Sequence, residues 1–177
     1  RQRQMCIRDR EGKNELTGGN SGDFGTRGIT SGKGKLTIQG KEGSSLSTTG
    51  GSGTKGGSFG ICATSGKLDL VNATVTATGG VETEKDSNIK NSKLIANGGI
   101  GTNGKFTVGE GGEVIAIGKD VKTTDGKAQG GNALGFWGIG SGYEVQKGGK
   151  LTAIGGNAES KSGVATGGDA LNGTCGG

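Results

Sequence analysis

The sequence predicts an all-β protein, a single-stranded parallel β-helix (β-solenoid) made of glycine-rich repeats. Three observations predict it: glycine supplies 44 of the 177 residues, proline is absent, and short aliphatic runs recur at fixed offsets from glycine pairs. Glycine at this density disfavours helices, and no apolar stripe with helical spacing runs through the chain. Only 28% of the residues are hydrophobic. Stacked repeats need few apolar residues, because each turn covers the core of its neighbour.

One sequence element recurs five times: an aliphatic residue, a spacer, a small residue, a spacer and then usually a glycine pair. The copies begin at Leu46, Val75, Leu94, Val114 and Leu151, which are 29, 19, 20 and 37 residues apart. A period of 19 or 20 residues suits one turn of a parallel β-helix. We therefore interpret the interval of 29 residues as one turn with an insertion, and that of 37 as two turns, one of them degenerate.

Short alternating strands precede these copies. The residues predicted to face inward are Leu36 and Ile38, Leu68 and Leu70, Phe106 and Val108, and Tyr143 and Val145. A third marker, Gly-Ile, recurs at residues 28–29, 60–61, 99–100 and 138–139, and each unit of about 39 residues is expected to make two turns. Strands this short bury too little area alone, so stacking is their route to burial. Crossover chirality favours a right-handed coil.

The first ten residues differ from the rest of the chain. Residues 1–10 contain no glycine and four of the five arginines, and they resemble translated sequencing-adapter sequence. We predict that residues 1–10 are a foreign or disordered segment and that residues 11–177 are a β-solenoid fragment, incomplete at both ends. Without the segment the chain has 17 basic and 15 acidic residues, so the net charge of +5 gives no indication of nucleic-acid binding.

Composition excludes several classes of site. The chain has no histidine, which rules out Ser-His-Asp, Cys-His and histidine-ligand metal sites within it. Its cysteines, Cys6, Cys62 and Cys175, form neither a disulfide framework nor metal-ligand spacing. No run of 18 apolar residues is present, so no membrane span is expected. We predict a protein that is not an enzyme.

Two patterns suggest a cation. Glu82, Glu84 and Asp86 would face the same way if their segment were extended, which makes them candidate metal ligands, although a solvated acidic loop is the alternative. Partial calcium-repeat signatures occur at residues 130–134 and 167–171, but without the upstream glycine pair or the nine-residue period. No cofactor is required by these patterns, and calcium is the metal they leave open.

The candidate ligand contacts are aromatic and polar residues near the longest polar insertion. Phe136, Trp137 and Tyr143 form one aromatic cluster, which could stack against sugar rings or could close the core. The insertion itself, residues 118–133, adds Asp120, Asp125 and Asn132 as candidate contacts.

Lysines also stand just before the strands. They are Lys35, Lys67, Lys93, Lys105 and Lys150. We expect a solvated edge that discourages aggregation, with binding of an acidic polysaccharide as the alternative.

The Gly-Ile, Lys-Leu-Thr-Ile and Val-Thr-Ala-Thr-Gly-Gly elements resemble the β-helical carbohydrate-binding domain-containing proteins of gut Firmicutes and clostridia, a secreted family. The resemblance covers residues 28–173. It implies binding of plant polysaccharides with the assistance of calcium. The chain lacks a compact aspartate cluster, so the resemblance assigns no particular residue as a ligand.

Together these observations lead to one functional hypothesis and two rivals. The hypothesis is a non-catalytic, secreted or cell-surface bacterial module that binds polysaccharide on an elongated face. The rivals are a structural stalk or adhesin repeat region without a ligand of its own, and a fragment of a polysaccharide lyase or hydrolase. Which glycan is bound and the oligomeric state are left open by the sequence.

Overall fold

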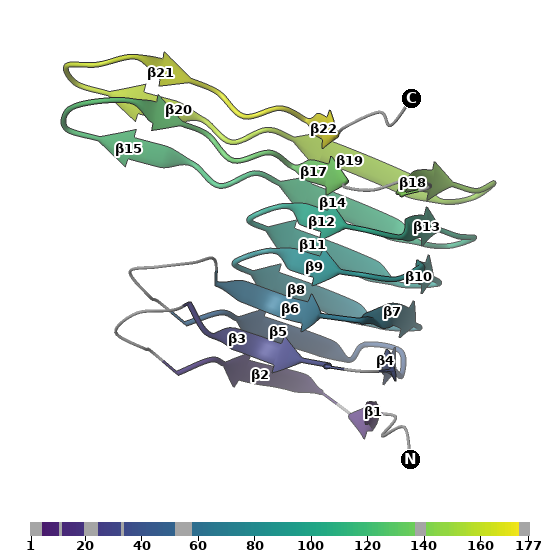
Figure 1. The fold of residues 1–177 in the computed structure, drawn as a ribbon. Helices are drawn as coiled ribbons and strands as arrows, with labels where there is room; N and C mark the ends of the chain where they lie inside the picture. Colours follow the sequence, from purple (N-terminus) through teal and green to yellow (C-terminus); the bar gives the residue numbers. More distant parts are fainter. Residues whose placement is uncertain are drawn as a thin grey trace.

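The protein is all-β, with parallel sheets and no helix in the part of the chain that the structure describes (Figure 1). The structure is a computed structural model that describes residues 5–10, 12–19, 25–32, 34–51, 58–136 and 141–173, with only the backbone described for 5–10. Three large sheets of six strands form the body, and every strand pairing is parallel.

Successive strands of the body belong to the first, second and third large sheet in turn, so each sheet contains every third strand. The first sheet contains β1 (Met5–Arg10), β4 (Gly34–Gly40), β7 (Gly66–Val71), β10 (Ser87–Lys90), β13 (Lys105–Val108) and β18 (Gly142–Val145). The second contains β2 (Lys13–Thr17), β5 (Ser45–Thr49), β8 (Thr74–Thr78), β11 (Lys93–Asn97), β14 (Glu113–Ile117) and β19 (Lys150–Ile154). The third contains β3 (Arg27–Thr30), β6 (Phe59–Ala63), β9 (Val81–Thr83), β12 (Ile100–Thr102), β17 (Leu134–Phe136) and β22 (Leu171–Gly173).

The chain visits the first, second and third sheets in turn and then starts again one layer higher. We call each circuit a turn, so that β1 to β3 form turn 1 and β18 to β22 form turn 6. Val75, Leu94 and Val114 lie directly opposite one another on successive turns. The predicted period of 19 or 20 residues is therefore confirmed for these turns.

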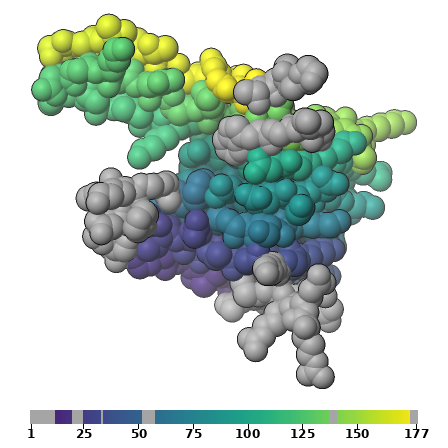
Figure 2. All heavy atoms as spheres, in the orientation of Figure 1, coloured from purple at the N-terminus to yellow at the C-terminus, as the bar shows by residue number. Residues whose placement is uncertain are grey.

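The interpretation of the 37-residue interval between Val114 and Leu151 as two turns is wrong. Val114 pairs directly with Leu151, so the two residues are one turn apart, and no degenerate turn lies between them. The extra residues leave the body instead, in turns 5 and 6. There β15 (Val121–Thr123) pairs with β20 (Ala158–Ser160), and β16 (Ala128–Gln129) pairs with β21 (Ala165–Thr166). This two-layered projection, residues 118–133 and 155–170, is called the arm, and its green and yellow atoms extend beyond the teal body in Figure 2.

The Gly-Ile units give a mixed result. Ile61 and Ile100 are separated by two turns through Val81, as expected for a unit of 39 residues. Ile29 pairs directly with Ile61, so this shorter unit makes one turn. The marker at residues 138–139 lies outside the described residues.

The core is a set of inward columns that run along the stack. The predicted inward residues of the first sheet from Leu36 to Val108 are buried, with Leu36, Leu68, Phe106 and Val108 at 0% exposure. The second sheet adds a column of small residues, in which Thr48, Ala77, Ala96 and Ala116 are also fully buried. Because each inward side chain contacts the ones above and below it, burial arises between turns and not within a strand.

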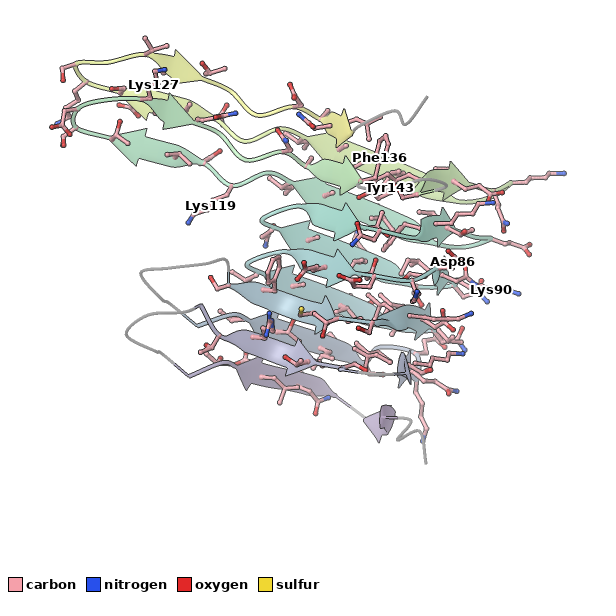
Figure 3. The ribbon with its side chains drawn as sticks, in the orientation of Figure 1. Asp86, Lys90, Lys119, Lys127, Phe136 and Tyr143 are labelled. Carbon is pink, nitrogen blue, oxygen red and sulfur yellow. The ribbon has the colours of Figure 1, made fainter. Side chains whose placement is uncertain are left out.

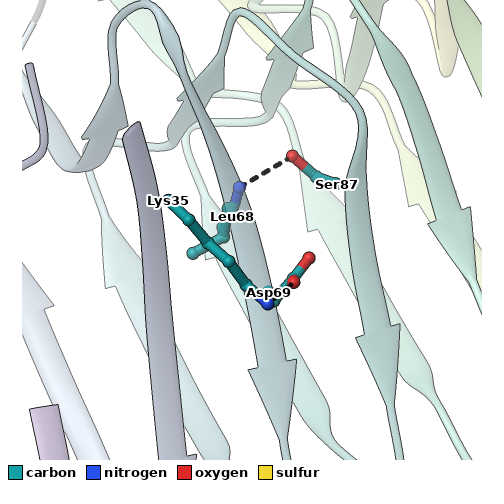
Figure 4. Close-up of polar contacts among 4 residues, drawn as sticks. All are labelled: Lys35, Leu68, Asp69 and Ser87. Carbon is teal, nitrogen blue, oxygen red and sulfur yellow. Dashed lines mark hydrogen bonds and ion pairs between the residues drawn. The ribbon is translucent and has the colours of Figure 1, made fainter. Parts of the chain in front are cut away.

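Polar side chains join neighbouring turns at the corners. The backbone N–H of Leu68 donates to the Ser87 hydroxyl (3.0 Å), and the N–H of Ala73 donates to that of Ser92 (3.1 Å). These bonds satisfy backbone groups that the strand ladders leave unpaired. Ser87 therefore occupies a core column at no loss of hydrogen bonding (Figure 4).

The lysines before the strands are interleaved with acidic residues. Lys35 pairs with Asp69 (2.6 Å) on the next turn, as seen in Figure 4, and Lys105 pairs with Glu144. On the second sheet Lys93 lies 3.0 Å from Glu113. Exposed pairs of this kind contribute little to stability, because water and salt screen the charges. The edge is charged, as expected, but its positive charges are partly neutralised.

Residues 5–10 extend the first sheet. The backbone of β1 pairs in parallel with β4, with Met5 opposite Leu36 and Ile7 opposite Ile38. The sequence placed this segment outside the fold, as foreign or disordered chain. A sheet edge offers unpaired backbone groups to any extended segment, so this pairing requires no repeat motif. The foreign origin of residues 1–10 stays a prediction.

At corners where the backbones of neighbouring turns lie close together, we expect that replacing glycine by a residue with a side chain destabilises the fold. Gly99 has φ +85°, and a Cβ there would lie 2.4 Å from the Asn132 carbonyl oxygen. We expect Gly99→Ala to lower the free energy of unfolding by about 3 kcal/mol, from backbone strain and steric overlap together. Gly126 in the arm has φ +75° with no atom within 4 Å of a Cβ, so Gly126→Ala should cost about 1 kcal/mol. Urea denaturation measures both, and equal losses would contradict this account of the corner.

Candidate functional site

The outer face of the third sheet carries a shallow groove. Inward Val81, Ile100 and Leu134 alternate with outward residues, and the outward column reads Glu82, Gly101, Gly135 and Asn172 on four successive turns. The two glycines leave a gap between a carboxylate and an amide. The resulting cavity has a volume of about 160 Å³, and Phe59 and Asn132 also line it.

Glu82 is held at one end of the groove by the turn before it. Cys62 lies directly opposite Glu82 on β6, and its thiol donates to the Glu82 carboxylate over 3.2 Å. The thiol is fully buried. Burial, followed by the hydrogen bond to Glu82 and its negative charge, raises the pKa of Cys62 to about 11, against a smaller opposing effect of Arg27. The thiol therefore remains a neutral donor that orients the carboxylate at neutral pH.

The opposite end of the groove is a chain of amide and carboxylate groups. The Asn172 side-chain amide donates to Asp169 (2.8 Å), and the backbone N–H of Asp169 donates to the Asn132 side-chain oxygen (2.9 Å). Asn132 and Asp169 are the residues that the partial calcium signatures share. In the structure Leu134 lies directly opposite Leu171, so the repeated pattern marks equivalent positions on turns 5 and 6.

Tyr143 supports the floor of the groove from inside the coil. Its hydroxyl donates to the carbonyl oxygens of Ile100 (2.7 Å) and Gly135 (2.9 Å), which share the one hydrogen. The ring packs against Phe106, with centroids 5.7 Å apart. Burial raises the pKa of the Tyr143 hydroxyl, with a weaker lowering by Gly135. Of the two alternatives predicted for Tyr143, a sugar contact or a residue that closes the core, the second agrees with this position of the ring beneath the floor.

Phe136 also packs inside. It follows outward Gly135 on β17, and a Cβ on Gly173 of the next turn would lie 2.2 Å from its ring. The Phe136 ring therefore occupies the space beneath Gly173, which agrees with the core-closing alternative of the two predicted for the aromatic cluster. Trp137, the third aromatic candidate, lies outside the described residues.

The three candidate contacts predicted in the insertion, Asp120, Asp125 and Asn132, do not lie together. Asp120 accepts the backbone N–H of Asn157 (2.7 Å), and Asp125 accepts a hydrogen bond from Thr124 (3.3 Å). Both carboxylates are exposed on the arm, near which Lys119 and Lys127 are labelled in Figure 3. Of the described residues predicted as ligand contacts, Asn132 alone lines the groove.

The proposed metal ligands do not converge. Strand β9 ends at Thr83 and the chain bends at Glu84, so the two-residue alternation that would align the three carboxylates is lost. Glu82 faces the groove, while Asp86 accepts the backbone N–H of Lys105 (2.9 Å) at a corner. Within the described ranges, no three His, Cys, Asp or Glu residues are grouped so as to hold a metal ion.

A larger open groove of about 790 Å³ lies at the corner between the first and second sheets. Asn72, Asn91 and the Lys93–Glu113 ion pair line it. It has no aromatic ring, and two of its four charged residues, Lys93 and Glu113, form an ion pair. The smaller groove is the better candidate, because it combines a carboxylate, amides and a ring around a floor without side chains.

Sequence reasoning missed Phe59, Asn172 and the two floor glycines. The available signal was register: Gly101 and Gly135 each follow an inward aliphatic residue and so fall on the outer face. Comparisons with known protein families, with curated proteins and with solved structures found no match. Across the described residues, no helix has the length and apolar character to cross a membrane.

Cys62 should make stability depend on pH in the alkaline range. An unfolded cysteine ionises near its ordinary pKa of 9.0, whereas the folded thiol resists ionisation up to about 11. Its contribution to the free energy of unfolding is complete below pH 9 and is lost as the pH rises through 11. The wild-type protein should therefore lose stability between these values more steeply than Cys62→Ala, measured by urea denaturation at each pH. Parallel pH profiles would show that Cys62 is not held in this way.

Proposed function

We propose that the chain is a non-catalytic, secreted or cell-surface module that binds polysaccharide in the groove of the third sheet. We propose further that its scaffold is a right-handed parallel β-solenoid. The parallel sheets visited in fixed order support the solenoid, and the handedness follows from the general preference of parallel crossovers. The resemblance to secreted carbohydrate-binding repeats supports the same assignment.

The observation that carries the proposal is the column Glu82, Gly101, Gly135 and Asn172. Strands in a sheet are about 4.8 Å apart, so the two polar residues stand about 14 Å apart across the glycine floor. Sugar hydroxyls both donate and accept hydrogen bonds, and a carboxylate and an amide at opposite ends supply complementary groups. Phe59 adds an apolar surface for the C–H face of a ring.

The size of the groove favours recognition of part of a long chain. Pockets that enclose drug-sized ligands have volumes of about 300–1,000 Å³, which exceeds the 160 Å³ found here. A single sugar ring could rest in it while the polymer continues along the surface. Additional weak contacts along the polymer would then raise the affinity.

The carboxylates favour binding over hydrolysis. Glycosidases use two carboxyl groups on either side of the scissile bond, about 5–10 Å apart. Glu82 is the only acidic side chain among the described residues that line the groove, and the Asp169 carboxylate near the other end accepts the Asn172 amide. The Cys62 thiol donates a hydrogen bond to the Glu82 carboxylate and so holds it in place.

Binding to a panel of plant and bacterial polysaccharides tests the proposal. Trp137 is the one tryptophan of the chain and follows Gly135 by two residues, so its fluorescence provides a local readout. Glu82→Gln and Asn172→Ala should each weaken binding about tenfold, the effect of losing one hydrogen bond worth about 1.4 kcal/mol. Isothermal titration calorimetry measures the dissociation constants.

Asp125→Asn is the control, because Asp125 is exposed on the arm and does not line the groove. It should bind as the wild type does. Absence of binding to every polysaccharide would overturn the proposal in favour of a structural stalk. Release of reducing ends or unsaturated products, lost in Glu82→Gln, would instead favour the lyase or hydrolase.

A further inference from the structure

The corner between the first and second sheets has connections of two lengths. Turns 3 and 4 pass from one sheet to the other through two residues, 72–73 and 91–92, whereas turns 2 and 5 use four, 41–44 and 109–112. In each longer connection the backbone N–H of the last residue donates to the carbonyl oxygen of the first, over 3.1 and 2.9 Å, which closes a β-turn. The short connections lie between the longer ones, and the recess that results is the open groove of about 790 Å³.

The floor of this corner groove carries two side-chain amides. Asn72 and Asn91 occupy equivalent positions on turns 3 and 4, because the strands on either side of them pair in register. Neighbouring strands are about 4.8 Å apart, so the two residues stand one strand spacing apart. Both are exposed, and within the described residues neither side-chain amide takes part in a hydrogen bond. Their donors and acceptors are therefore available to a ligand.

Backbone conformation alone does not account for these asparagines. Asn72 and Asn91 have φ of 51° and 46°, in the left-handed region that asparagine tolerates and glycine favours. In the longer connections glycine has that conformation: Gly43 has φ +79° and Gly111 has φ +66°. A Cβ on Gly111 would lie 2.4 Å from the Asn91 side-chain oxygen, so glycine there leaves room for the amide. Asparagine thus replaces glycine where the groove has its floor.

The charges around the floor balance one another. Lys93 and Glu113 form an ion pair (3.0 Å), and Lys41 and Glu42 stand on the connection of turn 2. Two positive and two negative groups favour neither a polyanion nor a polycation. Sugar hydroxyls both donate and accept hydrogen bonds, as the two amides do. The volume also lies within the range of about 300–1,000 Å³ that is usual for ligand sites.

We infer that the corner groove is a second carbohydrate-binding site, which holds a short segment of an uncharged glycan through the amides of Asn72 and Asn91. The choice of a glycan rests on the proposed function, but the corner groove and the groove of the third sheet share no residue. Two sites on one module raise the affinity for a polymer that reaches both.

Titration with cellotetraose, xylotetraose and mannotetraose, followed by nuclear magnetic resonance, tests the inference. The side-chain NH₂ resonances of Asn72 and Asn91, assigned by their loss in glycine variants, should shift with at least one of these neutral probes. Asn72→Gly/Asn91→Gly should weaken binding of that probe at the corner at least tenfold, followed through the backbone resonance of Lys93, because both amides are removed.

The double glycine variant should keep the fold, since glycine suits both φ values, and its urea midpoint should equal that of the wild type. If the midpoint falls, Asn72→Asp/Asn91→Asp takes its place. Aspartate also tolerates the left-handed region, and it removes the donors of both amides. The same tenfold loss is expected.

Ser65→Gly is the matched control. Ser65 is the third described non-glycine residue with a positive φ, 68°, and it lines neither groove. This variant should bind as the wild type does. The inference would be overturned if no neutral probe shifts the two amide resonances or if Ser65→Gly weakens binding equally. Binding at the corner of tetragalacturonate or a chitosan tetramer alone would also overturn it.

Glu82→Gln/Asn172→Ala separates the two sites. It disables the groove of the third sheet and leaves the corner intact, so the shifts of the Asn72 and Asn91 amides should persist. Persistent shifts in a chain whose third sheet binds no glycan would contradict the proposed groove and support the corner site. Loss of the shifts in this variant would contradict an independent site at the corner.

Discussion

The structure depends on burial between turns. Its strands are two to seven residues long, and none has enough inward side chains to form a core by itself. Leu94 shows how the problem is solved: it is fully buried because Val75 and Val114 cover it from either side. Leu171, the last residue that the structure describes in its column, is more than half exposed.

This constraint leaves the outer surface free to vary. Inward positions must fill the stack and satisfy any polar group that they bury, as Ser87 does by accepting from Leu68, whereas outward positions need only suit a β-strand. Residues can therefore leave the body as the arm without disturbing the pairing of Val114 with Leu151. The groove arises in the same way, because glycine replaces the outward side chain at Gly101 and Gly135 while the inward columns continue beneath.

The sequence predicted the core well but did not reveal the groove, for a physical reason. Alternation and the fixed offset from glycine pairs identify inward residues such as Leu36 and Phe106, since stacking imposes one rule on every turn. A site depends on which residues from different turns meet. The interval of 37 residues between Val114 and Leu151 does not by itself show whether the chain makes one turn or two between them. For that reason the choice between core and surface stayed open for the ring of Tyr143, and Asn172 was not recognised across from Glu82.

Neighbouring positions on β11 provide the most direct test of burial between turns. Leu94 points into the stack and is fully buried, while Ile95 points outward and is half-buried. The account predicts that Leu94→Ala lowers the free energy of unfolding by about 2–5 kcal/mol. Ile95→Ala should lower it by about 1 kcal/mol or less. Equal losses in urea denaturation, or a larger loss for Ile95→Ala, would contradict a core formed by stacked inward columns.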